Sequence, residues 1–269
     1  MREFQVRTSH RPRPLPAGRW VMAQRWNDLL YAHWPLPPAA LSPLLPEGLQ
    51  LDTWQGSAWL GILPFWMDRI KFRGLPRIPG ARRAPELNLR TYVRDPQTGS
   101  PGVYFLSVDA SSLLSVAFAR TLYRLPSHWA DMDIEQRSER EFYFSSRRRF
   151  CAEPAIFAAR YRGLGPTRRL AEIRPGSLEY FLTERYCLFT HDHDGHPMRA
   201  DIHHVAAPLE EAEADIERND LASAVGIHLP NDPPVLHYSR RLAVYVWQLQ
   251  RTRALRAGQR IPAAAVPST

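Results

Sequence analysis

Residues 57–67 read SAWLGILPFWM, and this stretch decides the fold class. Both of its alternating sets of side chains are apolar: Trp59, Leu63 and Phe65 in one set, and Leu60, Ile62 and Trp66 in the other. A strand with two apolar sides is typical of a position covered by protein on both faces. We therefore expect residues 57–67 to lie deep in a sheet.

Residues 86–94 read ELNLRTYVR and alternate between two kinds of side chain. One set is Leu87, Leu89, Thr91 and Val93, and the other is Glu86, Asn88, Arg90, Tyr92 and Arg94. Such a period of two predicts a strand with two different faces. Residues 103–109 are its expected hairpin partner, across the turn-forming residues 95–100.

The same signals predict further strands along the chain, at 26–34, 129–135, 141–148, 155–162, 187–190, 198–205 and 235–249. Helices are expected at 39–45, 112–123, 178–186 and 210–225. Many strands with three or four separated helices predict an α+β protein built on a mostly antiparallel barrel or large curved sheet. We expect one domain at 16–253, between loose tails at 1–15 and 254–269.

Composition limits the class of protein and its partners. The 269 residues hold 44% hydrophobic side chains, and no apolar run is long enough to cross a bilayer, so we expect a folded, cytoplasmic protein without membrane contact. Cys151 and Cys187 form no Cys-x-x-Cys pair, which disfavours both a disulfide framework and a thiolate metal site. A homo-oligomer is compatible with these features.

Basic residues give a net charge of +8, with 34 Arg and the single lysine Lys71. Arg clusters occur at 147–149, 168–169 and 251–260, but they lie between elements and no nucleic-acid-binding motif accompanies them. A nucleic-acid partner is therefore not expected. With its only lysine in a Pro/Gly/Arg-rich stretch, the chain is also not expected to use a catalytic lysine amine.

Several strings in order resemble one family, the uncharacterised YqjF-like proteins: LLYAHW at 29–34, LLPEGL at 44–49, PELNLRTYV at 85–93, GSLEYFLTERY at 176–186 and IHH at 202–204. That family is similar, more distantly, to acetoacetate decarboxylase. The resemblance implies a cone-like antiparallel β-barrel with peripheral helices and a site inside the barrel.

Acetoacetate decarboxylase uses a Schiff-base lysine with an Arg and two Glu nearby. By resemblance, Arg25 matches the Arg and Glu86 matches one Glu. The second Glu falls near Gly61, and the lysine region matches 123–128, where this chain has no Lys. A guanidinium stays protonated and is no nucleophile, so Schiff-base decarboxylation is not expected.

One face of the strand at 86–94 carries the main candidate site: Glu86, Asn88, Arg90 and Tyr92. Inside a barrel this row would line a pocket, where burial would raise the pKa of Glu86 so that it could shuttle protons. Arg90 or Arg25 could bind a substrate carboxylate in a two-pronged fork. The alternative is a solvated outer face, and alternation alone does not decide between them.

Two further segments contribute candidates. Glu184 and Arg185 lie in the expected helix beside aromatic residues, as at the mouth of a substrate pocket, or else they tie the helix to the sheet. His203 and His204 occupy adjacent strand positions, so they point to opposite faces and cannot chelate one ion together. An interior histidine, assigned to His203, would suit a general base, and its alternative is a structural hydrogen bond.

Motifs for cofactors and metals are absent from the sequence. No dinucleotide-binding glycine motif, Walker loop, serine-hydrolase elbow or His-Glu-x-x-His occurs, so no cofactor is expected. The histidines and aspartates at 191–196 surround a hairpin tip, where a specific metal is not expected.

The sequence thus favours a protein that encloses a small anionic organic molecule and acts on it as a lysine-independent lyase, hydratase or isomerase. A non-catalytic binder or sensor on the same fold is the competing hypothesis.

Overall fold

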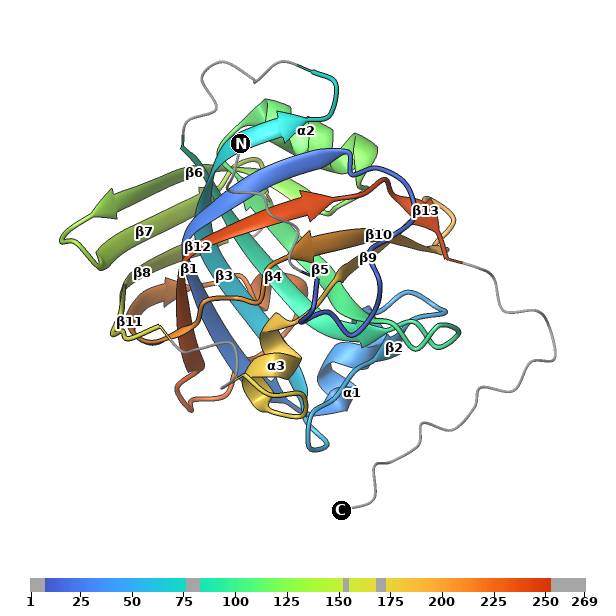
Figure 1. Cartoon of the computed structure of the whole chain (residues 1–269). Helices are drawn as coiled ribbons and strands as arrows, with labels where there is room; N and C mark the ends of the chain where they lie inside the picture. Colours follow the sequence, from blue (N-terminus) through green and yellow to red (C-terminus); the bar gives the residue numbers. More distant parts are fainter. Residues whose placement is uncertain (1–7, 76–82, 152–154, 168–172, 253–269) are drawn as a thin grey trace.

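The computed structural model describes residues 8–75, 83–151, 155–167 and 173–252 (Figure 1). Its strands are β1 (Met22–Leu36), β2 (Gln50–Leu51), β3 (Ala58–Phe72), β4 (Ala84–Arg94), β5 (Pro101–Ala110), β6 (Ser127–Gln136), β7 (Glu141–Arg148), β8 (Ile156–Gly163), β9 (Cys187–His191), β10 (Pro197–His204), β11 (Glu210–Asn219), β12 (Val235–Val246) and β13 (Gln250–Arg251). Its helices are α1 (Pro38–Leu41), α2 (Leu113–Leu122) and α3 (Leu178–Thr183), with 3₁₀ turns at Ser42–Leu44 and Ser223–Val225.

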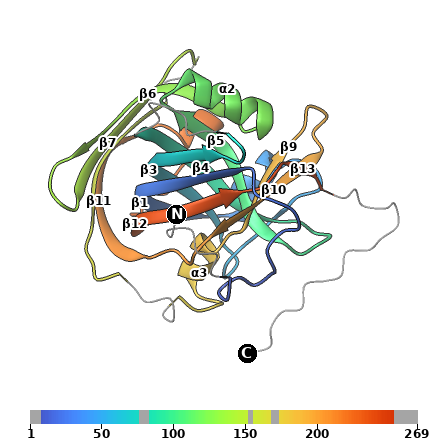
Figure 2. The ribbon, with the colours of Figure 1, turned by 45° about the horizontal axis from the view of Figure 1, so that its top comes forward.

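Five neighbouring strands, in the order β12-β1-β3-β4-β5, form a wall through the middle of the molecule. Strands β6, β7, β8 and β11 connect β5 back to β12 and close a nine-stranded barrel. Strands β9 and β10 form a second connection between β5 and β12. Strand β9 pairs with β5, β10 pairs with β9, and β10 also pairs with β12. Figure 2 shows these two closures curving away on opposite sides of the wall.

The two faces of the wall pack against different parts of the fold. Leu87 and Leu89 of β4 belong to the core that includes Phe144 and Phe157, inside the nine-stranded barrel. Tyr92 packs with residues of β9, β10 and α3, among them Leu182. We call this second face the α3 face; on β4 it carries Glu86, Asn88, Arg90 and Tyr92.

The predicted fold class is confirmed. The barrel is mixed rather than purely antiparallel, because β5 pairs in parallel with both β6 and β9. Ser112 and Ser177 cap α2 and α3, with each hydroxyl accepting a backbone N–H three residues on. None of the helices in the described part of the chain has the length and apolar content needed to cross a membrane.

The helix predicted at 210–225 is wrong, because residues 210–219 form strand β11. Ala212, Ala214 and Ile216 pack on the core while the residues between them are exposed, which is a period of two. Backbone pairing with β8 overrides the helix propensity of this Ala- and Glu-rich segment.

The N-terminal segment also differs from expectation over its described residues. The backbone oxygen of His204 lies 2.9 Å from Nε2 of His10, and Arg11 donates to the oxygen of Ile202 at 2.9 Å. Arg13 donates to the oxygen of Thr98 at 2.7 Å. Residues 8–15 are thus held against the barrel, whereas 1–7 and the expected tail at 254–269 lie outside the described residues.

Candidate functional site

The polar row of β4 lies inside the protein. Asn88 is 2% exposed and Arg90 is 6% exposed, and Tyr92 is fully buried. Of these four side chains, only Glu86 is partly exposed to solvent. The row is therefore a buried polar face of the wall and not a solvated strand surface.

Arg90 is a buried cation without a counter-ion among the described residues. Its Nη2 donates to the oxygen of Leu182 at 3.3 Å and to the hydroxyl of Tyr92 at 3.5 Å, and its Nε has no hydrogen-bond partner. No Asp or Glu among the described residues forms an ion pair with it. Burying a guanidinium unpaired costs free energy, so this arrangement needs a reason beyond stability.

Buried polar atoms without a hydrogen-bond partner gather on the α3 face. Among the described residues, such atoms on this face include Trp26 Nε1, His33 Nδ1, Trp59 Nε1, Asn88 Oδ1, Arg90 Nε, Ser127 Oγ and Ser239 Oγ. Their strand positions support this placement, since Asn88 is in register with Val108 and Val108 with Ser127. Native proteins rarely leave so many buried donors and acceptors unsatisfied, so this face is suited to a polar ligand.

Glu86 has an environment that suits proton transfer. Protein atoms surround its carboxyl, and this desolvation raises the pKa to about 7, although a hydrogen bond from Asn88 works in the opposite direction. A carboxyl with a pKa near neutrality can both accept and donate a proton under physiological conditions.

His33 and Tyr31 of β1 share this face, and we did not predict them. Nε2 of His33 lies 2.6 Å from the Tyr92 hydroxyl, whose proton goes to the oxygen of Leu182 at 3.0 Å. Burial, followed by the charge of Arg90, lowers the pKa of His33 well below its usual value. The signal was present in LLYAHW, where both polar side chains fall in one of the two alternating sets.

Glu184 and Arg185 are buried but already engaged. Arg185 forms a 2.6 Å ion pair with Asp52, and its guanidinium lies 5.0 Å from the centre of the Tyr92 ring. The Glu184 carboxylate accepts hydrogen bonds from the backbone N–H of Ala207 and from the hydroxyl of Tyr186. These contacts hold the end of α3 against the sheet. Glu184 and Arg185 therefore have the structural contacts expected of residues that tie the helix to the sheet, the alternative to a place at a pocket mouth.

The structure does not bring Arg25 and His203 to Arg90. Arg25 forms a two-pronged ion pair with Asp68, and it points away from the α3 face because its neighbour Trp26 packs there. His203 lies on the outer side of β10, where its Nδ1 is 3.1 Å from the Arg11 guanidinium. Adjacent strand residues point to opposite sides, so His204 is the one directed inward.

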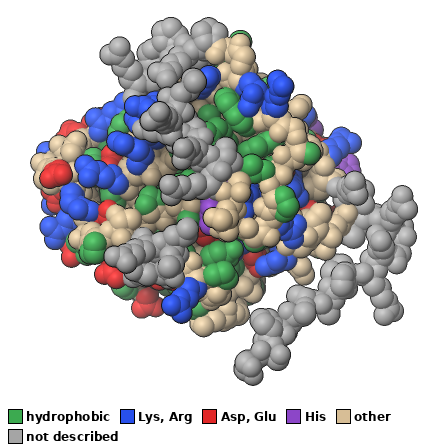
Figure 3. All heavy atoms as spheres, in the orientation of Figure 1, with side chains coloured by type: hydrophobic (Ala, Val, Ile, Leu, Met, Phe, Trp, Pro, Cys, Tyr) green, Lys and Arg blue, Asp and Glu red, His purple; other side chains and the backbone are tan. Residues whose placement is uncertain are grey.

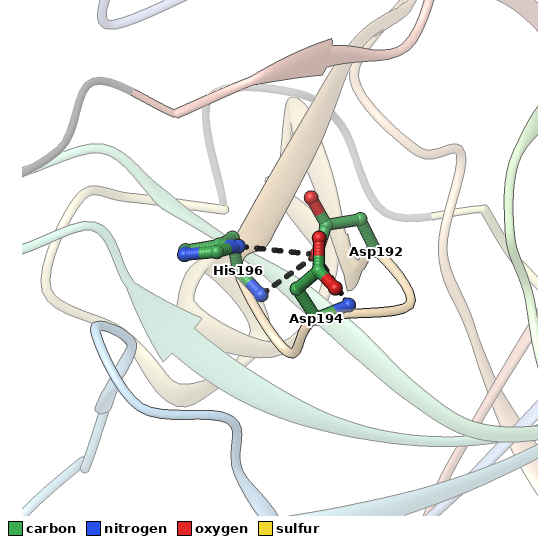
Figure 4. Close-up of side chains that lie close together, drawn as sticks. All are labelled: Asp192, Asp194 and His196. Carbon is green, nitrogen blue, oxygen red and sulfur yellow. Dashed lines mark hydrogen bonds and ion pairs between the residues drawn. The ribbon is translucent and has the colours of Figure 1, made fainter.

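The cluster Asp192, Asp194 and His196 at the β9–β10 hairpin is the one group in the described residues with metal-ligand spacing (Figure 4). Oδ1 of Asp192 accepts the backbone N–H groups of Asp194 and His196 at 3.0 and 2.9 Å. Its Oδ2 lies 2.9 Å from the guanidinium of Arg251. Both carboxylate oxygens therefore have protein partners, and the group is explained as the brace of a tight turn.

The described residues of the predicted Arg clusters do not form one basic surface. Arg148 turns inward to a buried ion pair with Asp109 at 2.7 Å, and Arg149 pairs outward with Asp131. Figure 3 shows Lys and Arg side chains in separate groups with acidic side chains among them. A shallow, open depression of about 340 Å³ lies on the outer face of strands β6, β7 and β8. It is not part of the α3 face. Residues 168–169 and 253–260 lie outside the described part of the chain.

The fold places the chain in a class, the proteins with the acetoacetate-decarboxylase-like fold. The acetoacetate decarboxylase of Legionella pneumophila superposes with a TM-score of 0.59 at 12% identity, over 89% of this chain and 92% of that one. The enduracididine biosynthesis enzyme MppR, in complex with pyruvate, gives 0.56 at 9% identity, over 87% and 91%. At these identities the likeness shows the fold alone.

The chain belongs to the DUF2071 family, described as an uncharacterized conserved protein, whose model matches residues 23–243. The uncharacterized protein YqjF of Bacillus subtilis is 44% identical over 237 residues, which is 88% of this chain and 95% of the relative. Both findings confirm the predicted family. Lys71, the single lysine of the chain, is exposed near the end of β3, so the α3 face offers no lysine amine.

Proposed function

We propose that this protein encloses a small anionic organic molecule and binds its carboxylate through Arg90. The observation that carries the proposal is the buried guanidinium of Arg90, which has no counter-ion among the described residues. A ligand carboxylate would supply the missing charge and accept two parallel N–H hydrogen bonds from the fork.

Glu86 and one relative of known structure support this proposal. Glu86 keeps accessible surface although protein atoms surround its carboxyl, which suits a side chain beside an internal space. MppR, which shares the fold, has been crystallised with pyruvate, a small carboxylate. The aromatic rings of Tyr31, Tyr92 and Trp59 give the α3 face apolar walls of the kind that ligand pockets use.

Catalysis, on this proposal, is proton transfer by Glu86. With a pKa near 7, its carboxylate can take a proton from a carbon beside a carbonyl group and its acid form can return it. No imine is needed for this step, which makes a lysine-independent lyase, hydratase or isomerase the favoured class. The competing function, a binder or sensor, needs Arg90 and the aromatic walls but not Glu86.

Binding is tested by calorimetric titration with two matched sets of acids. The first set is lactate, pyruvate and propanoate, and the second is mandelate, benzoylformate and phenylacetate. Arg90→Met is expected to weaken the best binder by about 30-fold or more, since hydrogen bonds to a charged group contribute roughly 1.5–3 kcal/mol. Arg162→Met, on the exposed outer face of β8, is the matched control and should leave affinity unchanged.

Unchanged affinity in Arg90→Met, or no binding of any of the six acids at millimolar concentration, would contradict the proposal. Proton transfer is tested separately, by NMR detection of hydrogen–deuterium exchange at the methyl group of bound pyruvate. Exchange that disappears in Glu86→Gln, with binding retained, favours the enzyme. Binding without exchange in the unmodified protein favours the sensor.

A further inference from the structure

The hydrogen bonds around Tyr92 fix the tautomer of His33. The Tyr92 hydroxyl has one proton, and the oxygen of Leu182, 3.0 Å away, can only accept. The Tyr92 oxygen must then accept from Nε2 of His33 at 2.6 Å. Nε2 therefore carries the hydrogen, and Nδ1 holds a free lone pair in a neutral ring.

Nδ1 of His33 is a buried acceptor to which no group of the described residues donates a hydrogen bond. The residue is fully buried, and Nδ1 has no hydrogen-bond partner among the described residues. Leaving such an atom unsatisfied costs roughly 1–3 kcal/mol. Arg90, on the same face of the wall, likewise has a buried group that the described residues do not satisfy, in its case a positive charge.

Gly61 makes the position of the imidazole possible. A Cβ at position 61 would lie 2.9 Å from both Cδ2 and Nε2 of His33, closer than real contacts allow. The resemblance to acetoacetate decarboxylase aligns the second Glu of that enzyme near Gly61. In this chain the ring of His33 occupies space that a side chain at 61 would need.

The Tyr92 oxygen also ties His33 to Arg90. It lies 2.6 Å from Nε2 of His33 and 3.5 Å from Nη2 of Arg90. The imidazole and the guanidinium are thus held in a fixed relation by one atom. Arg90 and His33 therefore belong to one hydrogen-bonded group of buried side chains on the α3 face.

We propose that His33 is a ligand-contacting residue whose Nδ1 accepts a hydrogen bond from the bound molecule, and that the ligand is a carboxylic acid bearing a donor group, such as a hydroxy acid. The inference rests on the proposed binding at Arg90 and adds the chemistry of the second contact. A site with a buried acceptor disfavours an otherwise identical acid that lacks the donor, because the acceptor then stays unsatisfied.

The test combines the tautomer of His33 with a comparison of three acids. In protein labelled with ¹⁵N-histidine, the ring signals missing from a His33→Gln variant assign His33, and Nδ1 is expected to be the unprotonated nitrogen. Lactate should bind about tenfold more tightly than propanoate, the gain of one satisfied hydrogen bond, and pyruvate should show no such gain. Lactate alone should shift the Nδ1 resonance.

Two variants separate the acceptor from the packing of the ring. The amide of His33→Gln can stand in for Nε2 and keep the contact with Tyr92, but it lacks an acceptor at the Nδ1 position, so the preference for lactate should vanish. His33→Asn places its amide near the Nδ1 position and should retain part of the preference. The tautomer and the ratio of lactate to propanoate affinity are measured on the unmodified protein, so they stand even where a variant fails to fold.

A proton on Nδ1, or equal Arg90-dependent affinity for lactate and propanoate, would overturn the assignment of His33 and leave the proposed function intact. Absence of binding by every acid would overturn both. The dependence of binding on Arg90 therefore distinguishes the two failures.

Discussion

Replacing Glu86 by Gln should remove a pH dependence from the stability of the fold. Burial raises the pKa of Glu86 from 4.5 to about 7. Between these two pH values the folded protein keeps a proton on Glu86 that the unfolded chain has released. A group with a raised folded pKa contributes stability that is complete below pH 4.5 and is lost as the pH rises through about 7. At roughly 1.4 kcal/mol per pKa unit, the loss from pH 4 to pH 8 is on the order of 3 kcal/mol.

Urea unfolding at several pH values measures this loss. Buried histidines such as His33 and His203 have lowered pKa values and give the opposite slope at acidic pH, so only the difference between the two proteins isolates Glu86. Glu86→Gln should gain stability over the unmodified protein as the pH rises from 5 to 8. Glu47→Gln, at an exposed position, is the control. A difference that stays constant over this range would refute the burial of the Glu86 carboxyl.

Three further substitutions test the buried polar groups, each by urea unfolding. Arg90→Met should raise the free energy of unfolding by about 1–4 kcal/mol, because it removes a buried charge that has no counter-ion among the described residues; a loss of stability would show that the charge is compensated in the fold. Gly61→Ala should lower it by about 1–3 kcal/mol through the clash with His33, and an unchanged value would place the imidazole elsewhere. Arg148→Met should lower it by about 3–5 kcal/mol by leaving the Asp109 carboxylate buried alone, and adding Asp109→Leu should restore most of the loss.

Local sequence patterns were enough to predict most strands of the barrel. The period of two at 86–94 identified β4, and the doubly apolar stretch at 57–67 identified the buried strand β3. The pattern failed at β11, where Ala and Glu satisfy a helix period as well as a strand period. Pairing with β8 decided that segment, and pairing between distant strands is not encoded locally.

The candidate site could be predicted only in part. Alternation placed Asn88 and Arg90 on one face of β4, since side chains two apart must point the same way. It could not add His33, which joins them from a strand more than 50 residues away through the hydroxyl of Tyr92. The roles assigned to Glu86 and His203 remain predictions.

The sequence by itself determined that the chain has one lysine, Lys71, and hence that it lacks a second lysine amine on which a Schiff-base mechanism could depend. It also determined the alternation that separates the two faces of β4. Only the tertiary structure decided which face is closed off by α3, β9 and β10, and that Arg25 finds Asp68 while Arg90 finds no carboxylate among the described residues. The physical reason is that a charge is neutralised by whatever lies near it in space, and for a strand those neighbours are set by long-range pairing.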